Sequence, residues 1–302
     1  MSRYRILSLD GGGVRAVVTA VLLERLEAAY PGFLSKVNLL AGTSAGGILA
    51  LGLAAGLSPA QQRDVFEKKG QEIFYFSLLR RLGNIIVAKY SNRNLKRELV
   101  TLLGNKKLGQ LSKKVLIASI DLDTKPSDPA AFRSWKPKFF HNYPGPNSDA
   151  NELCVDVALR TSAAPTLFPT YQGYIDGGIV ANSPSVCALA QALEASTGAQ
   201  KLEDIILLSV GASRNPRYLT EENADWGWAQ WAVPIVELLL EEGNNSIANF
   251  QCCQILGDHY RRLNLFLPER IDVDDATKVP RLEELAWKVD LTEIVNWLKS
   301  NW

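Results

Sequence analysis

Short apolar runs alternate along the chain with longer segments of mixed polarity. The short runs are typical of buried β-strands, and the longer segments are typical of helices that pack on a sheet. Because the two alternate from one end of the sequence to the other, the pattern predicts an α/β fold with a mainly parallel sheet covered on both faces. The predicted strands span residues 4–9, 37–41, 115–122, 173–176, 205–210 and 260–267, with an extended edge pair over 132–143.

Helix ends are predicted from capping residues and from breakers. Ser58 followed by Pro59 marks a helix start, because serine caps free N–H groups and proline suits the first turn. Pro234 and Gly243 are predicted to interrupt a long helical region. Residues 77–89, which are apolar and basic, are interpreted as a packed connector rather than a flexible cover. The predicted helices span 16–29, 48–57, 59–76, 92–103, 153–161, 183–195, 228–256 and, as one or two helices, 282–298.

The sequence Gly42-Thr43-Ser44-Ala45-Gly46 connects a predicted strand to a predicted helix. This is a G-x-S-x-G pattern, in which a sharp turn presents a serine hydroxyl at the start of a helix. Glycines on both sides of the serine let the backbone turn tightly. The helix start favours a developing negative charge. Because the expected strand and helix flank the pattern, we interpret Ser44 as a nucleophile rather than as part of a packing turn.

A second glycine-rich turn, Gly11 to Gly13, follows the first predicted strand. The N–H groups of such a turn converge on an anion, either a nucleotide phosphate or the oxyanion of an acyl-transfer intermediate. A dinucleotide site also needs an acidic residue after the second strand, and that strand ends here in Ala41-Gly42-Thr43-Ser44. The nearby serine turn therefore favours the oxyanion. A glycine turn that serves only close packing is the structural alternative.

A serine nucleophile needs a base, and the chain contains only two histidines, His141 and His259. Neither is followed by the small residues that usually hold a catalytic loop. Asp176 is the stronger candidate, because it ends a short strand before two glycines, where ligand-facing residues lie in open parallel sheets. An aspartate with an ordinary pKa of about 4 is a weak base, so this role predicts a partly dehydrated carboxylate. A turn aspartate is the alternative.

Composition narrows the class of protein. The 302 residues, 47% hydrophobic and 22% charged, are typical of a globular chain with a large core, and we interpret residues 1–302 as one domain. The net charge of +1 gives no support for a nucleic-acid partner. The four cysteines do not have metal-site spacing, so we expect reduced thiols, no metal and no cofactor. The N-terminal segment lacks the apolar core of a signal peptide, and we expect a cytoplasmic protein.

Three segments taken together, Asp10 to Arg15, Gly42 to Gly46 and Asp176 to Gly178, resemble the patatin-like phospholipase family. The resemblance extends over about residues 5–210, and it implies a three-layer α/β/α fold and a Ser–Asp dyad without histidine. It also implies a glycerolipid acyl ester as substrate, cleaved through an acyl-serine intermediate without a metal. The implied site residues are the nucleophile Ser44, the base Asp176, and the oxyanion hole Gly11, Gly12 and Gly13 with Arg15 beside it.

The chain departs from the family pattern at two positions outside the dyad. Ala16 replaces a glycine often found after the glycine-rich run, and Ser183 replaces an asparagine often found before Pro184. Both bear on loop shape. Residues 211–302 show little resemblance, and we expect them to supply helices and the last strand of the same domain.

A serine lipid acyl hydrolase is the leading hypothesis. One alternative is an acyltransferase, but those that share the serine turn use a histidine base. The other alternative is a non-catalytic module that binds lipid or nucleotide, and the absence of a G-K-[ST] sequence counts against a nucleotide. A lipid ester substrate implies transient contact with a membrane or micelle surface. Trp226, Trp228 and Trp231, before the apolar run 233–240, are candidates for that contact, with core packing as the alternative.

Overall fold

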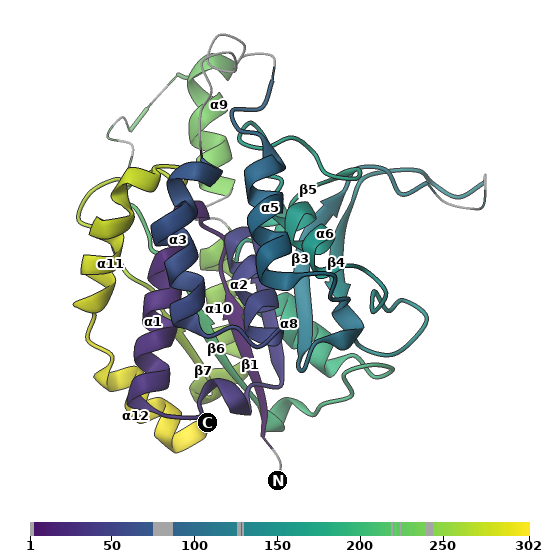
Figure 1. Cartoon of the computed structure of the whole chain (residues 1–302), viewed down its shortest axis with the longest axis vertical. Helices are drawn as coiled ribbons and strands as arrows, with labels where there is room; N and C mark the ends of the chain where they lie inside the picture. Colours follow the sequence, from purple (N-terminus) through teal and green to yellow (C-terminus); the bar gives the residue numbers. More distant parts are fainter. Residues whose placement is uncertain are drawn as a thin grey trace.

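The fold is seen in a computed structural model that describes residues 3–302, except 75–86, 126–127, 129, 219, 221, 224 and 240–243 (Figure 1). Its strands form one sheet in the order β4-β3-β2-β1-β6-β7, and β5 pairs with β3. All pairs are parallel except those of β4 and β5 with β3. The strands are β1 (Tyr4–Leu9), β2 (Leu39–Thr43), β3 (Lys114–Asp121), β4 (Lys136–His141), β5 (Tyr174–Asp176), β6 (Ile205–Val210) and β7 (Tyr260–Leu263).

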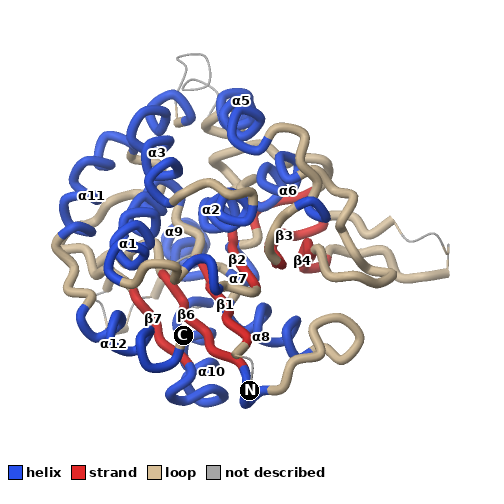
Figure 2. Tube along the Cα trace, turned by 60° about the horizontal axis from the view of Figure 1, so that its bottom comes forward, coloured by secondary structure: helices blue, strands red, loops and turns tan. Residues whose placement is uncertain are grey.

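Helices cover both faces of this sheet, as the alternating pattern predicts (Figure 2). Most of them lie on one face, namely α1, α2, α3, α5, α6, α11 and α12, and α8 and α10 lie on the other. The helices are α1 (Ala16–Ala29), α2 (Ser44–Ala54), α3 (Pro59–Ile73), α5 (Asn92–Leu103), α6 (Cys154–Thr161), α7 (Gly178–Ala181), α8 (Ser185–Leu193), α9 (Trp228–Glu237), α10 (Asn244–Leu256), α11 (Val279–Trp287) and α12 (Thr292–Asn301).

The central strand β1 shows how the two cores form. Side chains alternate along a strand, so Leu7 and Leu9 enter the core beneath α1 and α2 while Ile6 enters the core beneath α8. Ser8 faces the second side and accepts a 3.0 Å hydrogen bond from the Ser185 hydroxyl of α8. Both faces of β1 are buried, as expected for a strand at the centre of a covered parallel sheet.

Several element ends differ from the predictions. The second strand and the following helix meet at Thr43 and Ser44, because Gly46 and Gly47, which favour loops, are helical here. Pro234 does not break α9, which continues to Glu237, and the last strand ends at Leu263 rather than at 267. The short helix α7 was not predicted. Residues 77–86 of the predicted connector, and the predicted break at Gly243, lie outside the described residues.

The predicted start of the third helix is confirmed in detail. The Ser58 hydroxyl accepts a hydrogen bond from the Gln61 N–H at 3.2 Å, and the Gln61 side chain accepts one from the Ser58 N–H at 2.8 Å. This capping box satisfies two N–H groups that the first helical turn leaves without partners. It fixes the end of α3 that lies nearest to α2, and α3 then forms one wall of the cavity described below.

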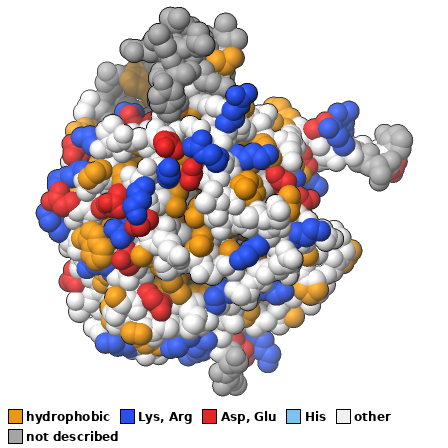
Figure 3. Space-filling view, viewed as in Figure 1, with side chains coloured by type: hydrophobic (Ala, Val, Ile, Leu, Met, Phe, Trp, Pro, Cys, Tyr) orange, Lys and Arg blue, Asp and Glu red, His pale blue; other side chains and the backbone are white. Residues whose placement is uncertain are grey.

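The helical face shown in Figure 3 carries interspersed acidic and basic side chains. Arg63 of α3, for example, lies within ion-pair distance of Glu24, Glu67 and Glu283, at 3.0 to 4.0 Å. This mixing agrees with the small net charge. In the part of the chain that the structure describes, every helix is too short or too polar to traverse a bilayer.

The turn between β2 and α2 depends on two glycines that allow close backbone contact. A Cβ on Gly46 would lie 2.4 Å from the carbonyl oxygens of both Leu9 and Asp10, and a Cβ on Gly42 would lie 2.4 Å from the Gly46 oxygen. The absence of these side chains lets the end of β1 pack directly on the first turn of α2. The two predicted turns thereby become neighbours.

Gly46→Ala is expected to lower the free energy of unfolding by about 3 kcal/mol or more, because the new methyl group overlaps two fixed carbonyl oxygens. Gly70→Ala is the matched control, since its Cβ would meet its nearest neighbour at an ordinary 3.6 Å. Within helix α3 that change should stabilise the protein by roughly 0.5–1 kcal/mol. Chemical denaturation of both variants checks this, and equal effects would contradict the close-contact explanation.

Candidate active site

Strand β3 brings Ser44 and Asp176 together because two strands, β2 and β5, pair with successive parts of the same edge of β3. β2 pairs with residues 114–118, and Thr43 lies opposite Ala118. β5 pairs antiparallel with residues 119–121, and Asp176 lies opposite Ser119. Because β4 occupies the other edge of β3 over residues 116–121, β2 and β5 share the same edge and meet end to end. Asp176 therefore arrives next to the turn that begins with Ser44.

Hydrogen bonds hold the backbone around Ser44 in an unusual conformation. Ser44 has φ of 54°, in the left-handed region that a non-glycine residue adopts at a cost of about 1–3 kcal/mol. Its N–H donates to the Thr161 hydroxyl at 2.9 Å, and that hydroxyl donates to the Ala118 carbonyl at 2.5 Å. The Thr43 hydroxyl donates to the Ala181 carbonyl at 2.6 Å. Through these hydrogen bonds the turn is held by three elements, α6, β3 and α7.

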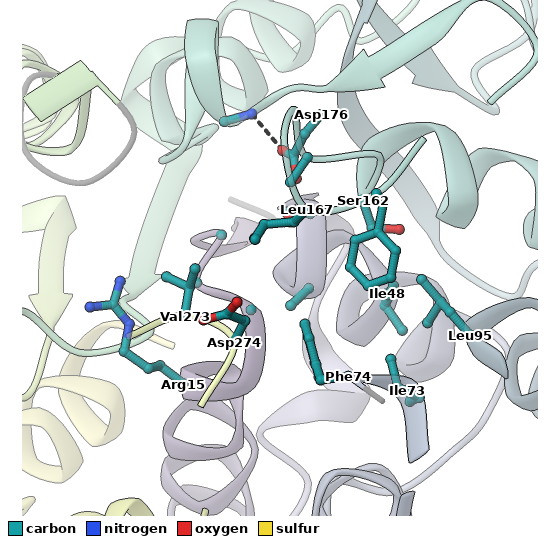
Figure 4. A pocket seen from close by; sticks show the side chains of 18 of the residues that line it. Arg15, Ile48, Ile73, Phe74, Leu95, Ser162, Leu167, Asp176, Val273 and Asp274 are labelled. Carbon is teal, nitrogen blue, oxygen red and sulfur yellow. Dashed lines mark hydrogen bonds between the residues drawn. The ribbon is translucent and has the colours of Figure 1, made fainter. Parts of the chain in front are cut away.

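Asp176 is buried and held in place by three backbone contacts. Its N–H donates to the Ala163 carbonyl at 3.0 Å, and its Oδ1 accepts a 2.7 Å hydrogen bond from the Gly178 N–H (Figure 4). Gly177 packs so tightly on β3 that a Cβ there would lie 2.5 Å from the Ala118 carbonyl oxygen. Burial raises the pKa of the Asp176 carboxyl to about 6, although the Ser44 side chain and the Gly178 N–H lower it in part.

The glycine-rich turn lies against Ser44, and its amides are not equivalent. A Cβ on Gly11 would lie 3.3 Å from the Cβ of Ser44, but the Gly11 N–H already donates to the Asn182 carbonyl at 3.0 Å. The N–H groups of Gly12 and Gly13, in contrast, donate to no acceptor among the described residues. Of the predicted oxyanion donors, these two remain available to an anion, whereas Gly11 allows a close approach to Ser44.

The residues that flank the three glycines are buried and fixed. Arg15 is almost completely buried in the cavity wall. Asp10 forms an ion pair with Arg262 of β7 at 2.6 Å, and Arg262 also donates to the Ser209 hydroxyl at 2.7 Å. The Val14 N–H donates to the Val273 carbonyl at 2.8 Å. The turn is therefore tied to the last strand and to the loop that follows it, both of which lie outside the region of sequence resemblance.

Ser44, Asp176 and the three glycines line one cavity of about 610 Å³. Its wall is mostly apolar on the side formed by α2, α3 and α5, where Figure 4 shows Ile48, Ile73, Phe74 and Leu95. On the opposite side the figure shows Arg15, Val273 and Asp274. The wall of the cavity is therefore mostly apolar, with charged side chains on the side opposite the apolar helices, and the predicted site residues lie in the same wall.

A contact that the sequence did not reveal joins three segments at the rim of this cavity. Asp274 accepts hydrogen bonds from the Lys89 ammonium at 2.6 Å and from the Tyr90 hydroxyl at 2.9 Å. The backbone N–H groups of Lys89 and Tyr90 donate to the carbonyls of Thr166 and Leu167. Sequence patterns did not identify Asp274 as a site residue, because it lies outside every motif, and its position after the last strand was the only signal available.

The two histidines lie away from the cavity. His141, in β4, is buried, and burial lowers the pKa of its ring. His259 precedes β7, at the opposite end of that strand from the cavity, and lies 3.2 Å from the Arg3 guanidinium. Neither lines the cavity. Among the residues that the structure describes, no cluster of histidine, cysteine and acidic side chains could hold a metal ion.

Comparison with known proteins adds an independent line of evidence. A model of the family described as patatin-like phospholipase matches residues 7–186. Protein teg of Priestia megaterium is 29% identical over the whole of both chains. A cGAMP-activated phospholipase of Pseudomonas aeruginosa is 31% identical, over 86% of this chain and 78% of that protein. The solved ExoU-SpcU complex of Pseudomonas aeruginosa contains a chain with TM-score 0.48 and 15% identity, covering 99% of this chain and 52% of that one.

The raised pKa of Asp176 predicts a stability cost at neutral pH. The folded-state pKa of about 6 exceeds the ordinary value of about 3.9, so folding takes up a proton between these values. The free energy of unfolding should therefore fall by about 3 kcal/mol as the pH rises through this window. Asp176→Asn keeps an acceptor for the Gly178 N–H but has no charge to bury. Denaturation at pH 8 should show a gain of about 1–3 kcal/mol, and at pH 4 little gain. A gain of the same size at both pH values would contradict this cause.

Proposed function

The chain belongs to the patatin-like phospholipase family, and on that premise we propose that it is a serine lipid acyl hydrolase with a Ser44–Asp176 dyad. The observation that supports this most strongly is that the serine turn and a buried carboxylate lie side by side in the wall of a mostly apolar cavity. The apolar side of the cavity suits an acyl chain, since burying each methylene contributes about 0.8 kcal/mol. The opposite side, with Arg15 and Asp274, suits the glycerol side of a lipid ester.

In the proposed reaction the Ser44 hydroxyl attacks the ester carbonyl, and its proton passes to the Asp176 carboxylate. The negative charge of the tetrahedral intermediate is stabilised by the N–H groups of Gly12 and Gly13, which donate to no acceptor in the described part of the chain. Collapse of the intermediate releases the lipid alcohol, which takes the proton from Asp176. Water, deprotonated by the same carboxylate, then attacks the acyl-serine. When this second tetrahedral intermediate collapses, the Ser44 oxygen takes the proton back from Asp176 and the fatty acid is released. The raised pKa suits Asp176 for both steps, because proton exchange is most efficient near the working pH.

A lipophilic fluorophosphonate tests the dyad directly. Intact-protein mass spectrometry should show one adduct on the wild type and none on Ser44→Ala. Asp176→Asn should react at least about 100-fold more slowly, because general-base catalysis is lost. Wild-type labelling should also decline below about pH 6, as Asp176 becomes protonated.

Thr19→Ser is a matched control, since this buried hydroxyl lies on α1 and donates to the Gly211 carbonyl at 3.1 Å. It should be labelled at the wild-type rate. An adduct that persists on folded Ser44→Ala protein would show that the reactive group lies elsewhere. Normal labelling of Asp176→Asn would remove Asp176 as the base.

Contact with a lipid surface is the second part of the proposal. Helix α9 lies at one end of the molecule, beyond the ends of α3 and α5 (Figure 1). Trp228, at its first turn, is 90% exposed, and Leu238 and Leu239 are also exposed. Trp226 instead packs on Trp231, with ring centroids 5.3 Å apart. Tryptophan favours the bilayer interface, so we assign the contact to Trp228 and give Trp226 a packing role.

Trp228→Ala should reduce binding to phosphatidylcholine vesicles several-fold without changing the melting temperature, because this side chain loses little packing. Trp226→Ala should lower the melting temperature instead, since its ring pairs with Trp231. Trp135→Ala is the matched control, because Trp135 is 75% exposed in the segment before β4. Vesicle flotation measures the binding. An equal loss for Trp135→Ala would show that α9 has no special role.

A further inference from the structure

A second cavity, of about 320 Å³, lies where β6 and β7 end and α10 begins. Most of its lining residues are polar, and among the described residues they include three arginines and no carboxylate. The residues that line it are Gly11, Arg15, Asn182, Ser213, Arg214, Asn245, Ser246, Asn249, Arg262, Asn264 and Phe266. Most of these follow residue 210, so neither the sequence motifs nor the proposed reaction explains them.

Ser213 supplies a buried hydroxyl group in this wall whose hydrogen-bonding capacity is unused. The residue is only 9% exposed, and its Oγ has no hydrogen-bond partner among the described residues. Its φ of 71° adds backbone strain that a serine normally avoids. The buried Asn264 Oδ1 likewise has no partner in the described part of the chain. Because an unsatisfied buried polar group costs about 1–3 kcal/mol, two of them in one cavity indicate a bound polar ligand.

The charge of the wall indicates that this ligand is negatively charged. Arg15, Arg214 and Arg262 line the cavity, and its lining among the described residues includes no carboxylate. Asp10, which does not line the cavity, forms an ion pair with Arg262. Helix α10 also begins here, and the amino-terminal end of a helix favours a negative charge. Arginine pairs well with phosphate because its planar donors match two phosphate oxygens at once.

The second cavity adjoins the candidate active site. It shares Gly11, Arg15 and Asn182 with the larger cavity. Asn182 holds the glycine-rich turn through its carbonyl, which accepts the Gly11 N–H, and its Nδ2 donates to Asn245 of α10 at 3.2 Å. A ligand that contacts Asn245 therefore acts on the turn that would bind the oxyanion.

We propose that this cavity binds the phosphate group of a phosphate ester, with Arg214 and Ser213 as contacts and Asn264 as an acceptor for a ligand hydroxyl. The phosphate can come from the head group of the lipid substrate or from a separate soluble phosphate ester. Both sources use the same contacts, and they differ in their effect on the reaction.

Direct binding tests the site without any need for turnover. Ser44→Ala protein is titrated with inorganic phosphate and with glycerophosphocholine, a soluble phosphodiester, and followed by calorimetry or NMR. Adding Arg214→Gln should weaken binding at least about tenfold, because a charged hydrogen bond is lost. Ser213→Ala should weaken binding several-fold while leaving the melting temperature of the unliganded protein unchanged or raised, since it removes an unsatisfied hydroxyl. A purely structural serine would not affect the ligand affinity.

Arg261→Gln is the matched control, because Arg261 precedes Arg262 on β7 and its guanidinium lies over the Trp297 ring instead, 5.9 Å from its centroid. It should bind both probes as tightly as the parent protein. The proposal fails if folded Ser44→Ala protein shows no saturable binding of either probe. It also fails if Arg214→Gln and Ser213→Ala bind as the parent does.

Kinetics then identify the source of the phosphate, and this step rests on the proposed hydrolase function. If the site holds the lipid head group, Arg214→Gln raises KM for a phospholipid more than for a neutral ester with the same acyl chain, and glycerophosphocholine competes with the phospholipid. If it holds a separate effector, glycerophosphocholine changes kcat for the neutral ester, and Arg214→Gln abolishes the change. If the protein is not a serine hydrolase, the fluorophosphonate will not label Ser44. The binding of inorganic phosphate and glycerophosphocholine would be unaffected by that outcome.

Discussion

The shared edge of β3 is the constraint on which the candidate site depends. β2 and β5 run in opposite directions along this edge and meet between Ala118 and Ser119. Backbone pairing therefore fixes the separation of Ser44 and Asp176, and side-chain flexibility contributes little to it. The same junction also anchors Thr161, whose hydroxyl links the Ala118 carbonyl to the Ser44 N–H. A dyad positioned by sheet hydrogen bonds keeps its geometry without a third residue to orient the base.

Two features of the candidate site, its strained backbone and its buried carboxylate, lower the stability of the fold. Ser44 has a strained backbone, and Asp176 holds a carboxylate in a buried position that favours the protonated form. Neither would be retained by packing alone, because an ordinary turn and a neutral side chain would be more stable. The well-packed sheet and its two cores, centred on strands such as β1, compensate for these costs. Concentrated local strain of this kind is typical of functional sites.

Sequence patterns predicted the α/β class and the mainly parallel sheet, because strands and helices alternate and glycines mark the turns. They also predicted Ser44, Asp176 and the glycine-rich turn, which lie within short motifs. They could not predict Arg262 or Asp274, since each reaches the site from a part of the chain that is distant in sequence and has no motif of its own. The different status of the Gly11 and Gly12 amides depends on where the Asn182 carbonyl lies, which only the folded chain defines.

The ion pair between Asp10 and Arg262 also sets an order of events during synthesis. Asp10 lies in the turn that follows β1, and its carboxylate is buried. Its partner lies on β7, the last strand of the sheet, and leaves the ribosome long after Ser44 and Asp176 have done so. Until β7 pairs with β6, the glycine-rich turn lacks the cation that neutralises Asp10. A nascent chain therefore carries every motif residue before the ion pair that holds the glycine-rich turn can form, and the candidate site is complete only after β7 has joined the sheet.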